Sequence, residues 1–288
     1  MEQDIQRALI TKYRKNIYAK VLNALDTYQL IEDGDKIAVC VSGGKDSMLL
    51  AKCMQEVALH GSKKIEVIYI TMNPGYKENH LELIKENAKK LEIPLQIFDA
   101  PIFKYASEQE ENPCYICARM RRGYLYNYAK SQGCNKIALG HHLDDVIETT
   151  LLGLFYSNEI TFMRPKLRSK NFEGMELIRP LYEVKEKDII AWGKYHNLKF
   201  LACACPLAEK GLEGDSKRKE IKGIICELKK TNPEIDDCLF RSIHNLNIST
   251  VVGARKEDTK YSFNDIYELE GKEDEWKNRT TNWSWWLK

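Results

Sequence analysis

The chain has 288 residues, of which 43% are hydrophobic and 30% charged, and its formal net charge is +2. This composition is typical of a globular protein with one large or two small domains. The small net charge excludes a uniformly basic surface, so any contact with nucleic acid must come from local basic clusters. No apolar run approaches the roughly 20 residues of a membrane span, and the polar start lacks a signal-peptide pattern. We therefore expect a cytoplasmic protein that does not contact a membrane.

The first two thirds of the chain predict alternating strands and helices. A helix is expected within 5–30, where apolar residues recur at steps of three and four among lysines and arginines. The predicted strands cover 36–41, 65–70, 95–98 and 136–139, and the following helices begin at 46 and cover about 78–91 and 115–131. This alternation predicts a Rossmann-like α/β fold, a parallel sheet with helices on both faces. Ligands of such sheets bind at the carboxyl ends of the strands.

The last third predicts a smaller, α-rich portion that begins at about 151. Helices are expected around 186–197, 216–230 and 233–247. From 254 the chain becomes polar and charged, and we assign no function to this tail. The expected organisation is an N-terminal helical segment (1–33), a nucleotide-binding domain (34–200), a C-terminal helical part (201–253) and a polar tail (254–288).

The segment 42–47 is the strongest functional signal. It follows a buried strand and opens a helix, and its two glycines let the backbone approach an anion closely. Its spacing matches neither P-loop NTPases nor dinucleotide-binding folds, which disfavours a GTPase or a dehydrogenase. The alternative is an ordinary glycine turn. The residues expected to hold a nucleotide phosphate are Ser42, Gly43, Gly44, Lys45, Asp46 and Ser47.

Two further segments are expected at the same edge of the sheet. Residues 71–75, with Met72, follow the second strand, and residues 140–145 follow the fourth. We expect Met72, Gly140, His141 and Asp145 to complete a nucleotide pocket with the phosphate segment. Asp144 and Asp145 begin a helix, so capping or magnesium binding is favoured over general-base catalysis.

Two cysteine pairs predict a metal site. Cys114 and Cys117 lie three residues apart at the start of a helix, which places both thiols on one side and favours thiolates. Cys203 and Cys205 follow a predicted strand and could meet the first pair at a sheet edge. The spacing leaves open a structural zinc held by four thiolates, an iron–sulfur cluster held by three, or a chance occurrence. The remaining cysteines fit apolar patterns as core residues: Cys40, Cys53, Cys134, Cys226 and Cys238.

Basic residues gather beside the first cysteine pair. Arg119, Arg121 and Arg122 follow it directly, and a second basic stretch at 164–170 contains Arg164 and Lys166. A solvated helix face would explain one such cluster. Together with the basic N-terminal helix, the clusters favour binding of polynucleotide phosphates.

These motifs, in this order, resemble the tRNA-cytidine 2-sulfurtransferase family of PP-loop ATP pyrophosphatases, and the resemblance spans about residues 10–245. It rests on segments 42–47, 114–123, 137–145, 164–167 and 178–181 and on the late cysteine pair. The family implies an adenine nucleotide α-hydrolase fold, ATP with Mg²⁺, and a [4Fe–4S] cluster held by three cysteines. It also implies the substrate, a cytidine in the anticodon loop of tRNA.

The resemblance implies that ATP adenylates the C2 oxygen of the cytidine, which sulfur then replaces. Lys45 would stabilise the departing pyrophosphate, and Asp46 would bind magnesium. Cys114, Cys117 and Cys203 would hold the cluster, which would receive sulfide from a donor such as a cysteine desulfurase. One residue separates the late cysteines here, whereas the family often has two, so Cys205 is the alternative third ligand.

Two other functions stay open. Another adenylating enzyme of this fold, such as a tRNA lysidine synthetase or an amide-forming ligase, would generally lack the clustered thiols. A nucleotide-binding iron–sulfur sensor would bind ATP without releasing pyrophosphate. A homodimer is a further expectation.

Overall fold

The computed structural model describes residues 5–107, 113–200, 216–256 and 258–268. The chain forms two compact units, residues 1–240 and 241–288. The first unit contains the phosphate segment, the sheet and the basic clusters. No helix among the described residues is both long enough and apolar enough to cross a membrane.

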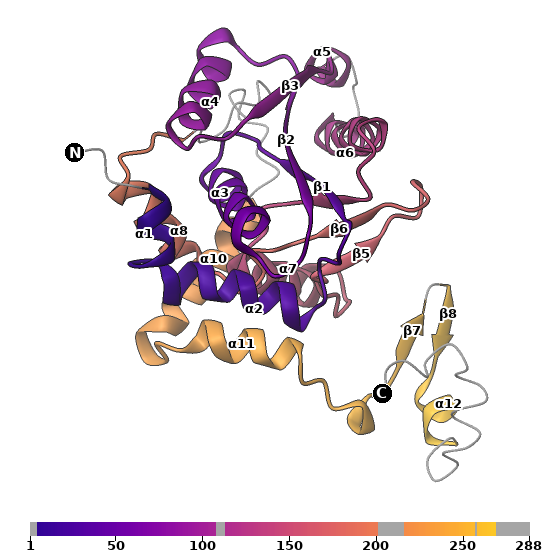
Figure 1. The fold of residues 1–288 in the computed structure, drawn as a ribbon. Coiled ribbons are helices and arrows are strands. Elements are labelled where there is room, and N and C mark those ends of the chain that lie inside the picture. The colour runs from indigo at the N-terminus through magenta and orange to yellow at the C-terminus, as the bar shows by residue number, and fades with distance from the viewer. Residues whose placement is uncertain (1–4, 108–112, 201–215, 257, 269–288) are drawn as a thin grey trace. The chain divides into compact units, whose positions relative to one another are not determined.

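A six-stranded sheet forms the centre of the first unit, in the order β3-β2-β1-β4-β6-β5 (Figure 1). Its strands are β1 (Lys36–Cys40), β2 (Glu66–Asn73), β3 (Leu95–Asp99), β4 (Lys136–Ala138), β5 (Lys166–Arg168) and β6 (Glu176–Ile178). All pairs are parallel except β5 with β6. The predicted α/β fold and its first four strands are confirmed. The prediction of an α-rich region from 151 was wrong for β5 and β6, which are too short for a recognisable alternation.

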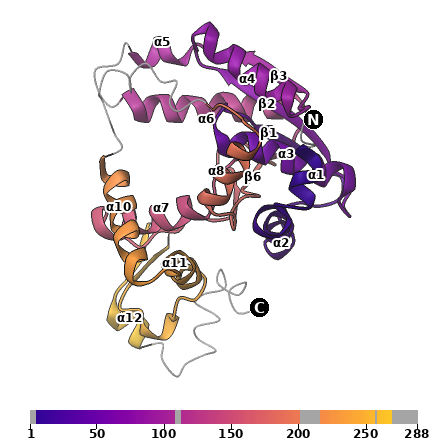
Figure 2. The same cartoon turned by 90° about the vertical axis from the view of Figure 1, so that its left-hand side faces the viewer.

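Helices cover both faces of the sheet. The helices of this unit are α1 (Ile5–Ile10), η1 (Arg14–Tyr18), α2 (Ala19–Thr27), α3 (Lys45–His60), α4 (Glu78–Lys90), α5 (Ile102–Ser107), α6 (Pro113–Ser131), α7 (Leu143–Tyr156), α8 (Glu186–Tyr195), α10 (Ser216–Thr231) and α11 (Ile235–Ile243), the last of which crosses into the second unit. Figures 1 and 2 show α3 and α4 on one side of the sheet and α5 and α6 on the other.

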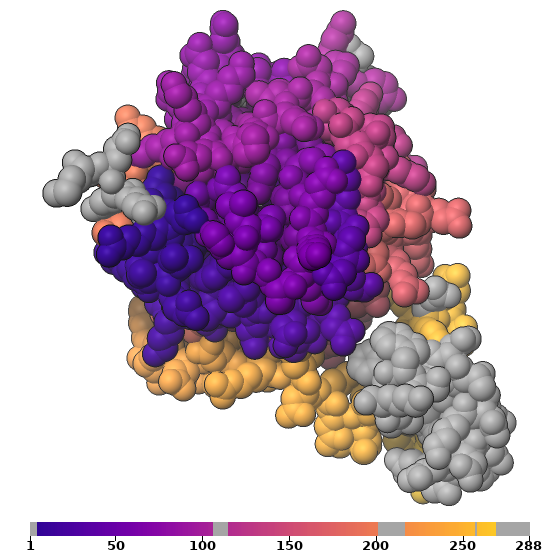
Figure 3. Space-filling model, in the orientation of Figure 1, coloured from indigo at the N-terminus to yellow at the C-terminus, as the bar shows by residue number. Residues whose placement is uncertain are grey.

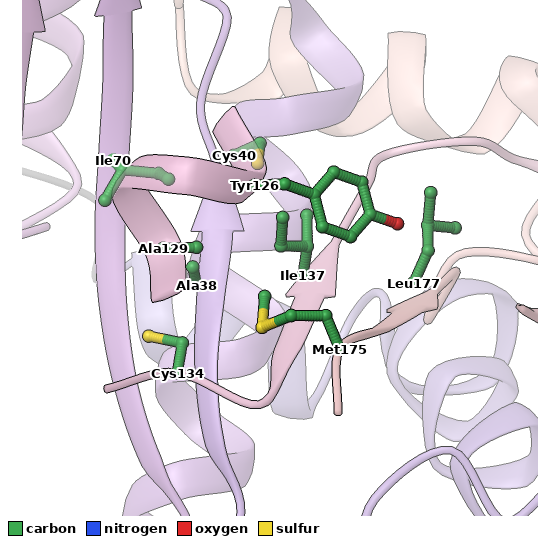
Figure 4. Close-up of a cluster of buried hydrophobic side chains, with 9 residues drawn as sticks. All are labelled: Ala38, Cys40, Ile70, Tyr126, Ala129, Cys134, Ile137, Met175 and Leu177. Carbon is green, nitrogen blue, oxygen red and sulfur yellow. The ribbon is translucent and has the colours of Figure 1, made fainter. Parts of the chain in front are cut away.

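Alternation along the strands explains this layering. Ala38 and Cys40 of β1 pack in a buried cluster with Tyr126 and Ala129 of α6 (Figure 4). Ile37, like the other odd-numbered residues of the strand, points to the opposite face. The even-numbered and the odd-numbered residues from Ile37 to Cys40 are all buried. The sequence of the strand is therefore a continuous apolar run, as expected for a parallel strand that is covered on both faces.

The N-terminal helical segment docks on the first unit. The hydroxyl of Tyr13 donates a hydrogen bond to the backbone oxygen of Ala191 in α8, at 3.1 Å. Leu9, Ile17 and Val21 are fully buried. Figure 3 shows this segment, in indigo, at the molecular surface. The apolar stripe predicted within 5–30 is therefore a packing face, although the helix is divided by a π-helical turn at η1.

The second unit contains a small hairpin and a short helix. Strands β7 (Ala254–Lys256) and β8 (Thr259–Tyr261) pair antiparallel, and a 3-10 turn, η2 (Ile248–Thr250), precedes them. Helix α12 (Phe263–Tyr267) begins at Ser262, whose hydroxyl accepts from the Asp265 amide, while the Asp265 carboxylate accepts from the Ser262 amide. This reciprocal cap explains how so short a helix starts here.

Candidate functional site

The segment 42–47 forms a compact loop between β1 and α3. The Ser47 hydroxyl accepts a hydrogen bond from the Ser42 amide at 3.1 Å and donates one to the Gly44 oxygen at 3.0 Å. Gly43 has a φ of 85°, which only glycine adopts without strain. No side chain caps the start of α3 at Gly44. The first amides of α3 are therefore available to a phosphate, which they bind together with the helix dipole.

The end of β4 lies directly against the start of α3. A Cβ added to Gly140 would be 3.0 Å from the carbonyl carbon of Asp46 and 3.1 Å from the Ser47 nitrogen. Only a glycine lets the two backbones come this close. The two segments that were predicted to share a pocket therefore adjoin each other, and Gly140 acts through backbone proximity.

Lys45 is held between two carboxylates. Its ammonium lies 3.2 Å from Asp46 and 2.9 Å from Glu186, the first residue of α8. Burial opposes the charge on Lys45, but these two carboxylates outweigh it and raise the pKa of Lys45. Burial likewise acts to raise the pKa of Glu186, but Lys45 and Lys222 outweigh it and lower this pKa to about 2. Lys45 is therefore a fixed positive charge at the loop.

One carboxylate oxygen of Asp46 lacks a hydrogen-bond partner among the described residues. This atom, Oδ1, is buried, and His142 Nε2 lies 3.6 Å from it. Burial raises the pKa of Asp46, while His142 and Lys45 act in the opposite direction. A carboxylate oxygen is a preferred ligand of Mg²⁺, so this atom fits the predicted magnesium site.

Asp144 and Asp145 fix backbone geometry. The Asp145 carboxylate accepts a hydrogen bond from the His142 amide at 3.0 Å, within a capping box at the start of α7. The Asp144 carboxylate accepts from the amide of Glu186 at 2.6 Å, and so joins α7 to α8. The Asp145 contact caps its own helix, one of the two roles favoured from the sequence, whereas the Asp144 contact joins two helices and places Glu186 beside Lys45.

His141 lies at the end of β4 beside Arg179, which follows β6. The Arg179 Nε atom donates to His141 Nδ1 at 3.3 Å. Burial, assisted by the Arg179 charge, lowers the pKa of His141 to about 4. His141 is therefore neutral at pH 7 and accepts through Nδ1, which makes it a hydrogen-bonding group in this pocket.

Met72 of the predicted nucleotide pocket and Cys117 of the first cysteine pair meet in one apolar cluster. Met72, at the end of β2, packs with Phe103 of α5 and with Cys117 of α6, which is 6% exposed. Helix α6 begins at the carboxyl edge of the sheet, because a helix that connects parallel strands runs back against them. Cys117 and the phosphate loop therefore occupy the same edge of the sheet.

The rest of the predicted metal site lies outside the described residues. This applies to Cys203, to the alternative ligand Cys205 and to the side chain of Cys114. Among the residues that are described, no three His, Cys, Asp or Glu side chains form a metal-binding group. The strand predicted before Cys203 was wrong at 198–200, where Lys199 instead accepts a hydrogen bond from Asn87 of α4 at 2.6 Å.

Comparison with known proteins places this site in a family. A family model described as a PP-loop domain matches residues 12–204. The tRNA-cytidine(32) 2-sulfurtransferase of Geobacter metallireducens is 34% identical over 238 residues, which cover 82% of this chain and 91% of the relative. The chain belongs to this family. The enzyme of the same name from Coxiella burnetii is 33% identical over 247 residues, covering 84% and 93% of the two chains.

A solved structure shares the fold of this family member. The U34-tRNA thiolase NcsA from Methanococcus maripaludis, solved with its [4Fe-4S] cluster, superposes with a TM-score of 0.66 and 22% identity. The match covers 85% of this chain and 81% of NcsA. The predicted family and the PP-loop nucleotide-binding fold are thus confirmed.

The predicted RNA-binding residues of this sulfurtransferase-family chain have different environments. Arg119, Arg122 and Arg164 are exposed. Arg121 lies over the Phe103 ring at 5.2 Å and joins α6 to α5. The Lys166 ammonium is already bound by the Gln29 oxygen at 2.9 Å and lies 3.4 Å from Glu176. The three exposed arginines are therefore better placed than Lys166 to meet a polyanion.

Two site residues were missed from the sequence. Glu186 was included only in a predicted helix, and Arg179 only in a motif that carried the family resemblance. Neither has a local signal, because Arg179 reaches the site through the order of strands and Glu186 through the contact of its amide with Asp144. The knowledge that β6 is next to β4 would have placed Arg179 at the carboxyl edge.

Proposed function

We propose that this chain is an ATP-dependent tRNA sulfurtransferase that converts cytidine 32 of tRNA to 2-thiocytidine, in the cytoplasm. The proposal rests on family membership and on one observation: Cys117 packs in one cluster with Met72, which lies near the end of β2 at the same edge of the sheet as the phosphate loop. An enzyme that activates a base oxygen and then replaces it with sulfur needs its two reagents close together.

The first step forms a bond between the cytidine C2 oxygen and the α-phosphorus of ATP, and breaks the bond to pyrophosphate. In the second step sulfide attacks C2, and AMP leaves with the former base oxygen. Lys45 and the free amides of α3 would stabilise the negative charge on the departing pyrophosphate. Asp46 would hold the magnesium ion through its unpartnered oxygen, and the ion would share that charge.

Cys114, Cys117 and one late cysteine, Cys203 or Cys205, would hold the iron–sulfur cluster. The thiolase NcsA, which shares this fold, carries a [4Fe-4S] cluster. When bound, the cluster would supply the site where sulfide from a donor such as a cysteine desulfurase is held. Cys117 suits this role because it lies in the N-terminal part of α6, three residues after Cys114, at the edge of the sheet that holds the phosphate loop.

The decisive experiment is mass spectrometry of tRNA nucleosides from cells with and without the gene. We expect 2-thiocytidine to disappear when the gene is deleted and to return on complementation. An unchanged set of thiolated nucleosides would remove the proposal. Pyrophosphate release with tRNA but without thiolation would instead indicate another adenylating enzyme, and ATP binding without any release would indicate a sensor.

A matched cysteine pair tests the metal site in the purified protein. Cys117→Ala should lose the iron and sulfide content and thiolation, while ATP binding survives. Cys134→Ala removes a similarly buried thiol from the hydrophobic core beneath α6. This variant should keep its iron and sulfide content, thiolation and ATP binding. Equal cluster content in the two variants would contradict the assignment of Cys117. Light scattering on the same preparations tests the expected homodimer.

A further inference from the structure

Arg179 is a buried cation without an anion. Its side chain follows β6, the residue is 7% exposed, and its donors reach two neutral acceptors: the backbone oxygen of Arg164 and Nδ1 of His141. No carboxylate of the described residues lies within ion-pairing distance of its guanidinium. Burial lowers the pKa of Arg179 to about 10. Because a buried charge is costly unless it is paired, this arrangement indicates an anionic ligand.

The carboxylate whose charge acts on Arg179 already has other partners. The Asp145 charge acts on Arg179 in the direction that raises its pKa. However, Asp145 caps the His142 amide at 3.0 Å and lies 3.6 Å from Arg218 of α10. It cannot move to Arg179 without opening the start of α7. An anion that pairs with Arg179 therefore has to come from a ligand and not from Asp145.

A second arginine lies on α6, the helix whose Tyr126 packs in one buried cluster with Leu177 of β6. Arg122 is exposed and precedes Tyr126 by one helical turn, toward the carboxyl edge of the sheet. Burial raises the pKa of Tyr126, and the charges of Arg122 and Arg179 both act against this rise. Figure 4 shows the Tyr126 hydroxyl directed toward Leu177 of β6, two residues before Arg179. Two like charges that act on one hydroxyl repel each other unless an anion joins them.

The position relative to the phosphate loop limits what this anion is. Strand β4 separates β6 from β1, and two strand spacings amount to about 10 Å. Arg179 thus stands at the nucleotide edge of the sheet, two strands away from the phosphate loop that follows β1. His141 follows β4, the strand between β1 and β6. It accepts a hydrogen bond from Arg179 without adding charge, and so acts as a positioning residue for that guanidinium.

We propose that Arg179 and Arg122 bind a second phosphate oxyanion, distinct from the one held by residues 42–47. This inference rests on the proposed function, which offers two sources of such a group. One is the α-phosphate of the nucleotide, and the other is a backbone phosphate of the tRNA beside the target cytidine. A planar, forked guanidinium suits either source.

The test compares Arg122→Gln and Arg179→Gln with Lys64→Gln. Lys64 is exposed and precedes β2, so its substitution removes one positive charge at the opposite edge of the sheet. Binding of unmodified tRNA is measured across a salt series, and binding of a non-hydrolysable ATP analogue is measured separately. Thermal unfolding is recorded for all three variants. Arg122 holds no position in the core, so its variant stays informative even if Arg179→Gln unfolds.

If the ligand is a tRNA phosphate, Arg122→Gln should weaken tRNA binding about 5- to 10-fold and reduce the slope of log affinity against log salt by about 1, with analogue binding unchanged. If the ligand is the nucleotide phosphate, analogue binding should weaken and the slope should stay the same. Either result supports the site, provided that Lys64→Gln matches the wild type. Unchanged binding of both ligands by the arginine variants would overturn it. Because these readouts need no turnover, they remain valid even if 2-thiocytidine formation fails.

Discussion

The two edges of the sheet use charged residues in opposite ways, although the same strands supply both. At the amino edge, Asp35 lies 2.7 Å from Lys136, and Glu176 lies 3.7 Å from the same ammonium. Asp35 also accepts from the Asn135 side chain at 2.7 Å and from the Glu32 amide at 2.6 Å. Lys136 is 3% exposed and Asp35 5%, so this is a buried network in which each charge has its partners.

The carboxyl edge leaves its charged and polar groups incompletely paired. Asp46 Oδ1 and His142 Nδ1 are buried without hydrogen-bond partners among the described residues, and Arg179 has only neutral acceptors. A satisfied network contributes to stability, whereas unsatisfied groups cost free energy until a ligand binds them. Substitutions at the amino edge should therefore change stability, and substitutions at the carboxyl edge should change activity.

Asp35→Asn should have the largest effect and should act on stability. Removing the carboxylate leaves the buried Lys136 short of a partner, at a cost of about 3–5 kcal/mol in the free energy of unfolding. Denaturant unfolding at pH 7 measures this. Lys64→Gln, a substitution of an exposed residue at the same edge, should remain within about 0.5 kcal/mol of the wild type.

The pH dependence sharpens this prediction. Burial acts to raise the pKa of Asp35, but hydrogen bonds from Lys136, Asn135 and the Glu32 amide outweigh it and lower this pKa. The stabilisation is therefore complete above the unfolded-state pKa of about 3.9 and is lost as pH falls through the lower folded-state pKa. The difference between the wild type and Asp35→Asn should close only below about pH 4. A difference that already closes near pH 6 would contradict the assignment.

Lys45→Ala should affect activity with little change in stability. Loss of the ammonium removes a charge that stabilises the departing pyrophosphate, which we expect to lower kcat/KM for thiolation about 100- to 1000-fold. Pyrophosphate release with saturating tRNA is the measurement. The substitution also removes the positive charge beside Glu186 and Asp46. A large fall in the free energy of unfolding would therefore contradict the distinction between an amino edge that determines stability and a carboxyl edge that determines activity.

Gly140→Ala should have an intermediate effect on both properties. The added methyl group would be 3.0 Å from the Asp46 carbonyl carbon, so β4 or the start of α3 has to move. We expect a loss of about 1–3 kcal/mol in stability and about tenfold in activity. Gly123→Ala is the matched control, because no atom lies within 4 Å of its added methyl group. Equal activity of the two variants would mean that the contact at Gly140 does not position the loop.

The parts that the sequence predicted are those with a local signal. The strand before Ser42 and the helix after it are both visible as periodic apolar patterns, and so is α6 with its cysteine pair. Strands β5 and β6 have only three residues each, so they lack a period and depend on pairing with β4. The cap at Asp145 was predictable because capping needs only the nearest amides, whereas the contact from Asp144 to Glu186 depends on the packing of α7 against α8.

The site residues that were missed are the ones that tertiary structure brings in. Glu186 lies 141 positions after Lys45 along the chain, and only the hydrogen bond from its amide to Asp144 brings it there. Lys166 shows the reverse case. Its basic stretch predicted contact with RNA, but its ammonium is bound by groups from the segment between α2 and β1 and from β6. A sequence shows where charged residues occur along the chain. It does not show which of these charges are already paired in the folded structure.

The short antiparallel strand at the rim of the sheet has a consequence for self-association. An exposed strand edge invites another chain to add hydrogen bonds to it, which leads to aggregation. Strand β5 has only three residues, and its Arg168 side chain is 92% exposed. A second copy that aligned itself there would bring like charges together. This rim is therefore protected against strand addition, and a dimer of this protein would use another surface.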